Sequence, residues 1–267
     1  MDVEGEATKV MLSRDYDAAA AAYEAHWAPV LAKLVEKFVA QLGLSAAHEV
    51  LDLGTGTGSS LRHLMQGGSF LVGIDRSLAM LGRVPDEAAL AVMDAERLAF
   101  KEQSFGATTA MFVLFHLPHP EVAVREVRRI LKDGGCFAFT TWGAGDVGFR
   151  GFDIFDAVLD RHGATEGRTL YERHDLTDTP ERCRALLEEG GFEVVSVRAE
   201  RMEHRWTVEQ LIGFRTGVGS GRVRWDSLDK GARLGVLEEG RKTLAELPSD
   251  EMVFRHEVVY SIGRATR

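Results

Sequence analysis

Short apolar runs alternate with amphipathic segments through the middle of the chain. In each amphipathic segment the apolar residues recur every three or four positions, which is the spacing of one helical face. A strand–helix–strand order of this kind needs right-handed crossovers and gives a mostly parallel sheet with helices on both faces. The predicted strands cover 49–53, 70–75, 89–94, 108–114 and 136–142, and the predicted helices between them cover 59–65, 78–84 and 121–131. The pattern therefore predicts an α/β fold.

A helical pattern precedes this alternation. Residues 18–42 have a helical pattern, and the apolar residues from Val30 to Leu42 lie on one face. Pro29 is expected to divide the segment into two helices, because proline suits the first turn of a helix and breaks its interior. We expect a helical cap over residues 1–44.

The pattern changes after Trp142. Residues 143–178 are rich in Gly and Phe and fit neither a strand nor a long clean helix, so we interpret them as an insertion. A capped helix over 179–190 and a long strand over 192–206 follow. We expect one domain, residues 1–267, divided into the cap (1–44), a cofactor-binding core (45–142), two lid insertions (143–178 and 207–250) and the rest of the sheet (179–206 and 251–267), with a last strand over 252–264.

Composition narrows the functional classes. The chain has 267 residues, of which 45% are apolar, and a net charge of −9 with its basic residues dispersed, so we expect no nucleic-acid partner. The acidic N-terminus and the absence of a run of roughly 20 apolar residues predict a cytoplasmic protein without a membrane partner. His116 and His119 lack a third ligand nearby, so we expect no metal. Cys136 and Cys183 are expected to be buried thiols.

The stretch VLDLGTGTGSS, residues 50–60, places Gly54, Gly56 and Gly58 between a strand and a helix. At such a place the backbone N–H groups and the helix dipole bind anionic groups, provided that side chains leave room. A dinucleotide-binding loop follows the same logic, but its third glycine would fall at position 59, which is Ser59. The motif alone is also compatible with a structural turn.

Two carboxylates stand at the ends of the next two predicted strands. Asp75 is placed to accept hydrogen bonds from both hydroxyls of a ribose, and Asp94 is placed to accept one from an exocyclic amine of adenine. A surface charge or a helix cap is the alternative for Asp75. For Asp94 the alternative is capping the turn over 95–98.

Five segments together, EVLDLGTGTG, GIDRS, MDAERL, FHLPHP and LKDGGCFAFTTW, resemble the class I S-adenosylmethionine-dependent methyltransferases, in the small-molecule branch of the ubiquinone/menaquinone C-methyltransferases. The resemblance covers about residues 45–142. It implies a Rossmann-like sheet of seven strands, six parallel and the last antiparallel, with S-adenosyl-L-methionine across the C-terminal strand edges. The cofactor-binding residues that it implies are Tyr16, Asp52, Gly54, Thr55, Gly56, Gly58, Asp75, Arg76, Asp94 and Ala95.

Within that set, the three glycines would border the methionine moiety, Asp52 would brace the loop, and Asp94 with Ala95 would read adenine. Tyr16 would close over the methionine end. The chain departs from the common HHLPDP pattern at Phe115 and His119, which places in doubt any role of the missing histidine and aspartate.

His116 follows the fourth predicted strand, at the face where acceptor and methyl group should meet. A histidine of ordinary pKa, about 6.5, can serve as general base for a hydroxyl or an acidic carbon. An amine acceptor would need no strong base, and His116 would then only shape its loop.

The cap and the two insertions are free to cover an acceptor site. Their aromatic residues favour an apolar or aromatic acceptor, although each alone is also explained by core packing. Arg215 could meet a carboxylate or phosphate, with a solvated basic loop as the simpler explanation. The expected acceptor-binding residues are Tyr23, Trp27, Trp142, Phe152, Arg215 and Trp225.

We therefore expect an S-adenosylmethionine-dependent methyltransferase of a small, apolar or aromatic metabolite in specialised metabolism, as a monomer or homodimer. One alternative is a cofactor-binding regulatory protein without catalysis. A nicotinamide-dependent reductase is the other alternative, opposed by Ser59 and by the absence of a lysine four residues after any tyrosine.

Overall fold

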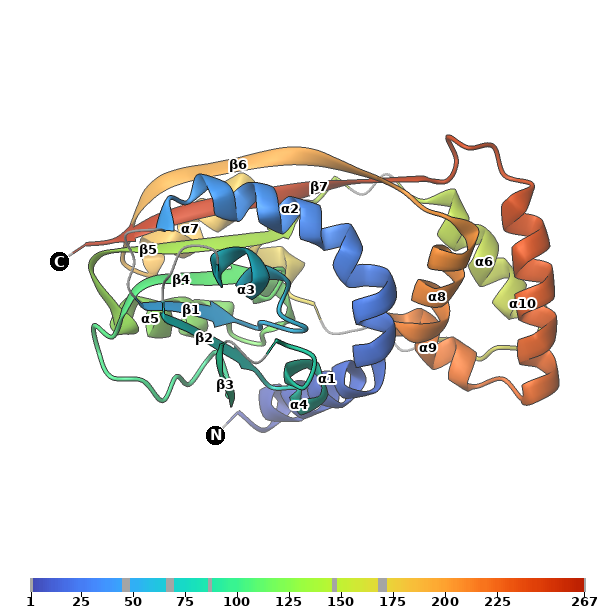
Figure 1. Cartoon of the computed structure of the whole chain (residues 1–267), viewed down its shortest axis with the longest axis horizontal. Helices are drawn as coiled ribbons and strands as arrows, with labels where there is room; N and C mark the ends of the chain where they lie inside the picture. The colour runs from blue at the N-terminus through green and yellow to red at the C-terminus, as the bar shows by residue number, and fades with distance from the viewer. Residues whose placement is uncertain are drawn as a thin grey trace.

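The computed structural model describes residues 2–44, 49–65, 70–85, 88–145, 148–167 and 172–266. Seven strands form one sheet in the order β3-β2-β1-β4-β5-β7-β6 (Figure 1). The strands are β1 (Glu49–Leu53), β2 (Phe70–Asp75), β3 (Ala89–Val92), β4 (Phe105–Met111), β5 (Leu131–Trp142), β6 (Phe192–Arg205) and β7 (Val253–Ala265). Only β7 among them runs antiparallel to its neighbours, so the predicted arrangement of six parallel strands and a last antiparallel strand is confirmed.

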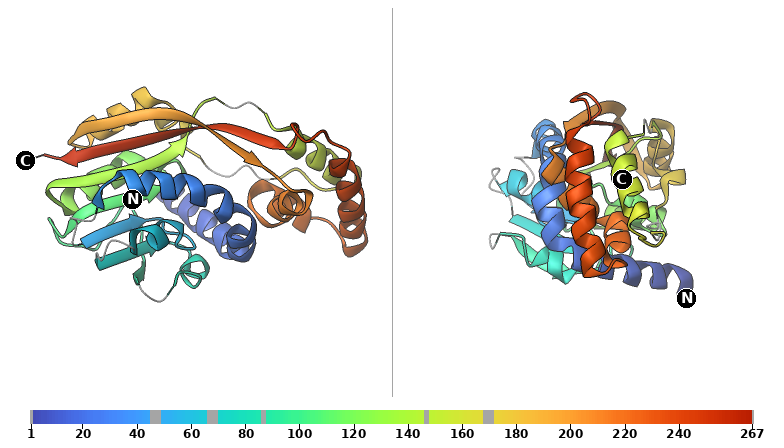
Figure 2. Two further views of the ribbon diagram at one scale, coloured as in Figure 1. Left: turned by 45° about the horizontal axis from the view of Figure 1, so that its top comes forward. Right: turned by 90° about the vertical axis from the view of Figure 1, so that its right-hand side faces the viewer.

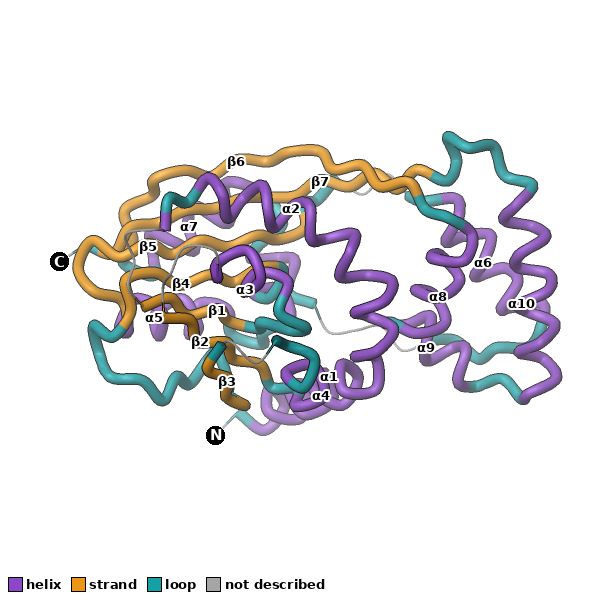
Figure 3. Tube along the Cα trace, in the orientation of Figure 1, coloured by secondary structure: helices purple, strands orange, loops and turns teal. Residues whose placement is uncertain are grey.

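Helices flank the sheet, and a helical group lies at one end of the molecule (Figure 3). The α-helices are α1 (Val3–Ala22), α2 (Ala28–Gln41), α3 (Ser59–Leu64), α4 (Leu78–Leu81), α5 (Pro120–Ile130), α6 (Arg150–Arg161), α7 (Pro180–Glu189), α8 (Val208–Gly217), α9 (Gly219–Asp226) and α10 (Lys230–Ala245). Single turns of π-helix (η1, Tyr23–Trp27) and 3₁₀-helix (η4, Leu114–His116; η5, His174–Leu176) complete the described helical elements.

The core has two layers because alternate residues of each strand face opposite sides. On β1, Val50 packs with α2 and α3, whereas Leu51 and Leu53 pack with α5 and α7. Val124 and Val127 of α5 and Leu187 of α7 are fully buried on the second face. Helices on both faces explain why the central strands are apolar along most of their length.

The N-terminal helical segment differs from its prediction. It begins at Val3 rather than near Ala18, but its predicted division into two helices at Pro29 is confirmed, because α2 begins at Ala28. The chain forms the π turn η1 just before Pro29, and Pro29 lies in the first turn of α2, where its missing N–H is tolerated. Helices α1 and α2 therefore form one helical run that changes direction at η1 (Figure 1).

The first insertion was also predicted wrongly, since residues 150–161 form the regular helix α6 with Phe155, Val158 and Leu159 buried. Strands β6 and β7 pair over their whole length and extend beyond the sheet towards α6, α8 and α10 (Figure 2). The expectation of one domain divided into a cap, a core and two lid insertions stays a prediction.

Candidate active site

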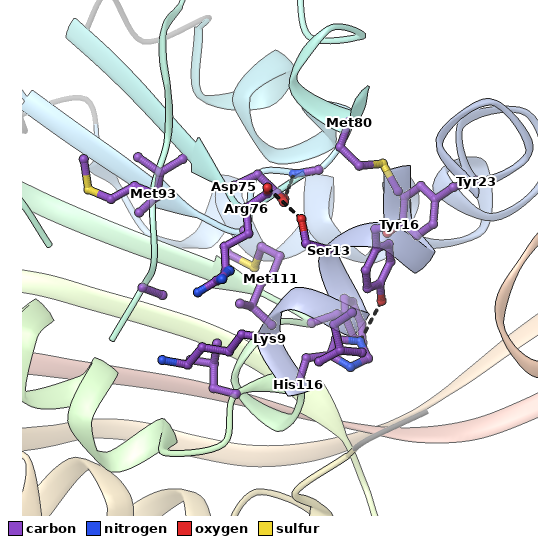
Figure 4. Close-up of a pocket in the computed structure, with 18 residues that line it drawn as sticks. Lys9, Ser13, Tyr16, Tyr23, Asp75, Arg76, Met80, Met93, Met111 and His116 are labelled. Atoms are coloured by element: carbon purple, nitrogen blue, oxygen red, sulfur yellow. Dashed lines mark hydrogen bonds between the residues drawn. The ribbon is translucent and has the colours of Figure 1, made fainter. Parts of the chain in front are cut away.

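A cavity of about 120 Å³ lies at the C-terminal edge of the sheet, beneath α1 (Figure 4). The strand order reverses between the neighbouring strands β1 and β4, because the chain adds β2 and β3 on one side of this pair and β5 on the other. Ligands of open α/β sheets bind at such a switch point. Eight of the predicted site residues line the cavity: Tyr16, Tyr23, Gly54, Gly56, Asp75, Arg76, Ala95 and His116.

The glycine loop leaves room for a ligand next to β1. Gly54 has φ +57°, and a Cβ atom added there would lie 2.5 Å from Cγ2 of Val113, which also lines the cavity. Gly56 has φ +54°, and among the described residues such a Cβ would meet only the carbonyl oxygen of Gly54, at 4.0 Å. Gly58 lies outside the cavity and caps the N-terminus of α3.

Asp52 and Thr55 are buried, and neither residue lines the cavity. The Asp52 carboxylate accepts hydrogen bonds from Oγ of Ser60 at 2.8 Å and Oγ1 of Thr109 at 2.6 Å. Burial raises the pKa of Asp52 to about 6 although these hydroxyls oppose the shift. Asp52 thus joins β1, α3 and β4 beneath the glycine loop.

Asp75 ends β2 at the cavity wall. Its Oδ2 accepts from the backbone N–H of Gly56 at 2.9 Å, and its Oδ1 accepts from that of Ser77 at 2.8 Å. Burial raises the pKa of Asp75 despite these two bonds. Each carboxylate oxygen can accept a second hydrogen bond, so the group fits a ligand that offers two adjacent hydroxyls, such as a ribose.

Asp94 lies outside this cavity. Its Oδ2 forms ion pairs with Nζ of Lys9 at 2.8 Å and Nη1 of Arg76 at 3.0 Å, which hold its pKa below the usual range against the effect of burial. Its Oδ1 accepts a hydrogen bond from the backbone N–H of Glu96 at 3.0 Å. This bond agrees with the alternative interpretation that Asp94 caps the turn over 95–98. The adenine role of Asp94 stays a prediction.

Besides Tyr16, α1 contributes three residues to the cavity that were not predicted. Lys9, Leu12 and Ser13 line it, and Oγ of Ser13 donates to the carbonyl oxygen of Arg76 at 2.9 Å (Figure 4). The apolar residues of this helix follow no single face, so periodicity did not reveal it. The available signal was Asp2, which caps the helix and is followed by two acidic residues in its first turn.

Tyr16 and His116 meet at one end of the cavity. The hydroxyl oxygen of Tyr16 lies 2.8 Å from Nε2 of His116 (Figure 4). Burial raises the pKa of Tyr16 well above its usual value, so this residue is a neutral phenol. Tyr23 packs edge-on against Tyr16, with ring centroids 6.2 Å apart.

The structure brings some of the expected acceptor-binding aromatic residues together outside the cavity. The ring centroid of Trp27 lies 6.0 Å from that of Trp142 and 4.6 Å from that of Phe214, which stacks on Phe152. Trp225 does not join them and packs beneath the guanidinium group of Arg233, 5.4 Å away.

Arg215 lies in α8 and not in a loop, so the alternative of a solvated basic loop is wrong. Only 11% of its side chain is exposed, and its guanidinium group pairs with Asp156 of α6. The helical fold of this insertion brings Arg224 of α9 to the same carboxylate, 3.3 Å from it.

Within the described ranges, no helix combines the length and apolarity needed to cross a membrane. Among the same residues, no three His, Cys, Asp or Glu side chains are grouped so that they could hold a metal ion.

Comparison with known proteins agrees with the geometry. A methyltransferase domain family matches residues 51–139. The chain is 36% identical over 171 residues to a demethylmenaquinone methyltransferase of Streptomyces griseus, covering 57% of this chain and 71% of that protein. Another relative, cycloartenol-C-24-methyltransferase of Arabidopsis thaliana, is 27% identical over 212 residues, which is 69% of this chain. The chain spans 61% of the length of that protein and 55% of an uncharacterized protein of Methanocaldococcus jannaschii.

Among solved structures, phosphoethanolamine N-methyltransferase 2 of Haemonchus contortus superposes with a TM-score of 0.58 at 17% identity, covering 97% of this chain and 60% of that one. At that identity the likeness supports the fold alone. The domain match and the bacterial relative show more than the fold. The chain belongs to the class I S-adenosylmethionine-dependent methyltransferases, of the type that includes the ubiquinone and menaquinone C-methyltransferases.

Proposed function

We propose that the protein transfers a methyl group from S-adenosylmethionine to a small, apolar or aromatic metabolite, in specialised metabolism. The observation that carries this proposal is the cavity. At the ends of β1 and β2 it is lined by Gly54 and Gly56, which have no side chains, and by Asp75, which bonds to the N–H of Gly56. A backbone of this kind admits the charged amino-acid end of the cofactor, while Asp75 offers acceptors to its ribose. The cofactor supplies an electrophilic methyl group when it is bound.

The chain's own contribution is largely to position the two reactants and to exclude water. Leu12, Tyr16 and Tyr23 of the N-terminal helical run, with Met80 and Met111, give the cavity mostly apolar walls. The methyl acceptor would have to approach from the end where Tyr16 and His116 lie, since Asp75 lies away from this pair on another wall of the cavity (Figure 4). An in-line displacement needs this separate approach.

The Tyr16–His116 pair can accept the proton that a hydroxyl or carbon acid loses as it is methylated. Nε2 of His116 is engaged by Tyr16, so the proton reaches the imidazole through the phenol oxygen or after α1 shifts. The phenol is neutral and can receive one proton as it passes its own to His116. For an amine acceptor the pair would only orient the nucleophile.

An assay of methyl transfer tests the proposal. The purified protein is incubated with methyl-labelled S-adenosylmethionine and a fractionated extract of small metabolites, and label in an apolar or aromatic product is expected. Labelled product only in highly polar fractions contradicts the acceptor class. Binding of S-adenosylhomocysteine without any methylated product supports the regulatory alternative.

A further inference from the structure

A second hollow, of about 590 Å³, lies between α6, α8 and the start of α9. Glu172 lines it, and the backbone N–H of the next residue, Arg173, donates to the carbonyl oxygen of Phe115 at 2.6 Å, directly before His116 of the cofactor cavity. An ion pair between Arg222 of α9 and Asp15 of α1, at 3.5 Å, joins the same two regions. The hollow is therefore the neighbour of the cofactor cavity on the His116 side.

Two largely buried guanidinium groups line this hollow. The side chains of Arg215 and Arg224 are 11% and 13% exposed, and both pair with Asp156. Among the described residues, the buried Nε atom of each arginine has no hydrogen-bond partner. A guanidinium group has five N–H donors, and buried donors without acceptors cost free energy.

Four carboxylates of the described part of the chain also line the hollow, and each is shared, exposed or paired elsewhere. Asp156 is one carboxylate shared by two cations, and its side chain is 33% exposed. Asp160, which also pairs with Arg224, is 67% exposed and therefore largely screened. Glu166 is exposed, and Glu172 is paired with His174 at 2.6 Å.

Aromatic rings form the wall beside the arginines. Cζ of Arg215 lies 5.1 Å from the ring centroid of Phe152, and this ring stacks on that of Phe214 at 5.6 Å. A flat apolar group can lie against these rings while its acidic substituent reaches the guanidinium groups.

We propose that this hollow binds an acidic group of the methyl acceptor, a carboxylate or a phosphate, through Arg215 and Arg224, with the apolar body of the acceptor against Phe152 and Phe214. Two planar donor groups on adjacent helices match the paired oxygens of either anion. The inference rests on the proposed methyl transfer and specifies the substrate class of the same site. It predicts an acceptor that is aromatic or apolar at one end and anionic at the other.

The test uses benzoate, phenyl phosphate and benzamide as probes, titrated by calorimetry into protein saturated with S-adenosylhomocysteine. At least one of the two anions should bind ten-fold or more tightly than neutral benzamide, and the tighter of the two identifies the anion class. Arg215→Gln should remove this preference. Arg241→Gln should retain it, because Arg241 is an exposed arginine that pairs only with Glu209 among the described residues.

Loss of Arg215 alone leaves the Asp156 carboxylate with only Arg224 of its two arginine partners, which can destabilise the fold. The double variant Asp156→Asn/Arg215→Gln therefore removes both charges of the pair together. Thermal unfolding and the affinity for S-adenosylhomocysteine are measured for each variant. If S-adenosylhomocysteine binds but the anions bind no better than benzamide, or if both folded variants keep the preference, this inference is overturned while the proposed function stands. If S-adenosylhomocysteine itself does not bind the wild-type protein, the proposed function fails first.

Discussion

The hydroxyl oxygen of Tyr16 lies 2.8 Å from Nε2 of His116, 100 residues further along the chain. Tyr16 belongs to α1 and His116 to the turn after β4, so this one hydrogen bond joins the cap to the C-terminal edge of the sheet. Both residues line the cofactor cavity. The bond therefore couples the position of α1 to the proposed proton acceptor.

Replacement of His116 by alanine should lower the turnover rate roughly ten-fold or more at saturating acceptor, because general base catalysis is lost. Tyr16→Phe keeps the ring in place and removes only the hydroxyl, so it should lower turnover while the affinity for S-adenosylhomocysteine changes little. Single-turnover transfer of labelled methyl groups measures the first quantity and calorimetry the second. An unchanged turnover rate in His116→Ala would exclude the base role.

Gly54→Ala and Gly43→Ala form a matched pair, because both glycines have a left-handed backbone, with φ +57° and +60°. A Cβ at Gly43 meets nothing within 4 Å, so this change should cost only about 1 kcal/mol of the free energy of unfolding. A Cβ at Gly54 meets Val113 at 2.5 Å, which should add about 1–3 kcal/mol and weaken S-adenosylhomocysteine binding. Urea unfolding and calorimetry measure the two effects. Equal behaviour of the two variants would contradict the close approach at Gly54.

Asp52 makes stability depend on pH. Its pKa in the folded protein, about 6, is above the ordinary aspartate value of 3.8, so its stabilising contribution is complete below pH 3.8 and is lost as the pH rises through 6. The loss amounts to about 3 kcal/mol, from 1.36 kcal/mol per pKa unit. Asp52→Asn does not titrate, and the stability of this variant relative to wild type should rise by about this amount between pH 4 and pH 8 in urea unfolding. Parallel stability curves would show that Asp52 ionises normally.

Lys9 holds α1 over the cavity. Its ammonium group pairs with Asp94 at 2.8 Å and Glu96 at 2.5 Å, and these bonds raise its pKa although burial opposes them. The cavity of about 120 Å³ is smaller than the ~300 Å³ at the lower end for ligand pockets, so we expect α1 to move outward when the cofactor enters.

Lys9→Ala should therefore accelerate S-adenosylhomocysteine association several-fold in stopped-flow measurements. Lys37→Ala is the control, because Lys37 is 62% exposed and pairs with Glu200 far from the cavity. Equal association rates in the two variants would mean that Lys9 does not restrain the helix.

The sheet could be predicted from the sequence because each central strand carries its own signal. The run from Val50 to Leu53 is apolar except for Asp52, and the runs before Asp75 and after Gly135 are also mostly apolar. These signals are local, since burial on both faces requires apolar residues at nearly every position. The number of strands and the antiparallel direction of the last strand were predicted from the family resemblance and not from the hydrophobic pattern.

Residues 3–17 of α1 and helix α6 were missed for different reasons. Helix α1 carries Lys9, Ser13 and Asp17 on the side that faces the sheet. These side chains bond to Asp94, Arg76 and Ser77, just beyond the ends of β2 and β3, so the helix has no continuous apolar face. Helix α6 contains an apolar face, but Gly151 and the flanking glycines obscured it. Tertiary contacts, not local propensity, stabilise both helices.

Site residues at strand ends were easier to predict than those supplied from a distance. Asp75 is the last residue of its strand, and Gly54 directly follows its strand. The pairing of Tyr16 with His116 instead depends on how α1 crosses the edge of the sheet. Phe112 is a comparable case. Its backbone has φ +59° at the cavity wall, a strained conformation for which the sequence gives no signal.

Calorimetric titration of S-adenosylhomocysteine and NADH into the wild-type protein and Asp75→Ala tests the central claim most directly. We expect S-adenosylhomocysteine to bind the wild-type protein at one site, with an affinity at least ten-fold weaker in Asp75→Ala, and NADH to bind neither. Binding of NADH alone, or S-adenosylhomocysteine affinity that is the same in both proteins, would contradict a nucleoside held between Asp75 and the glycine loop.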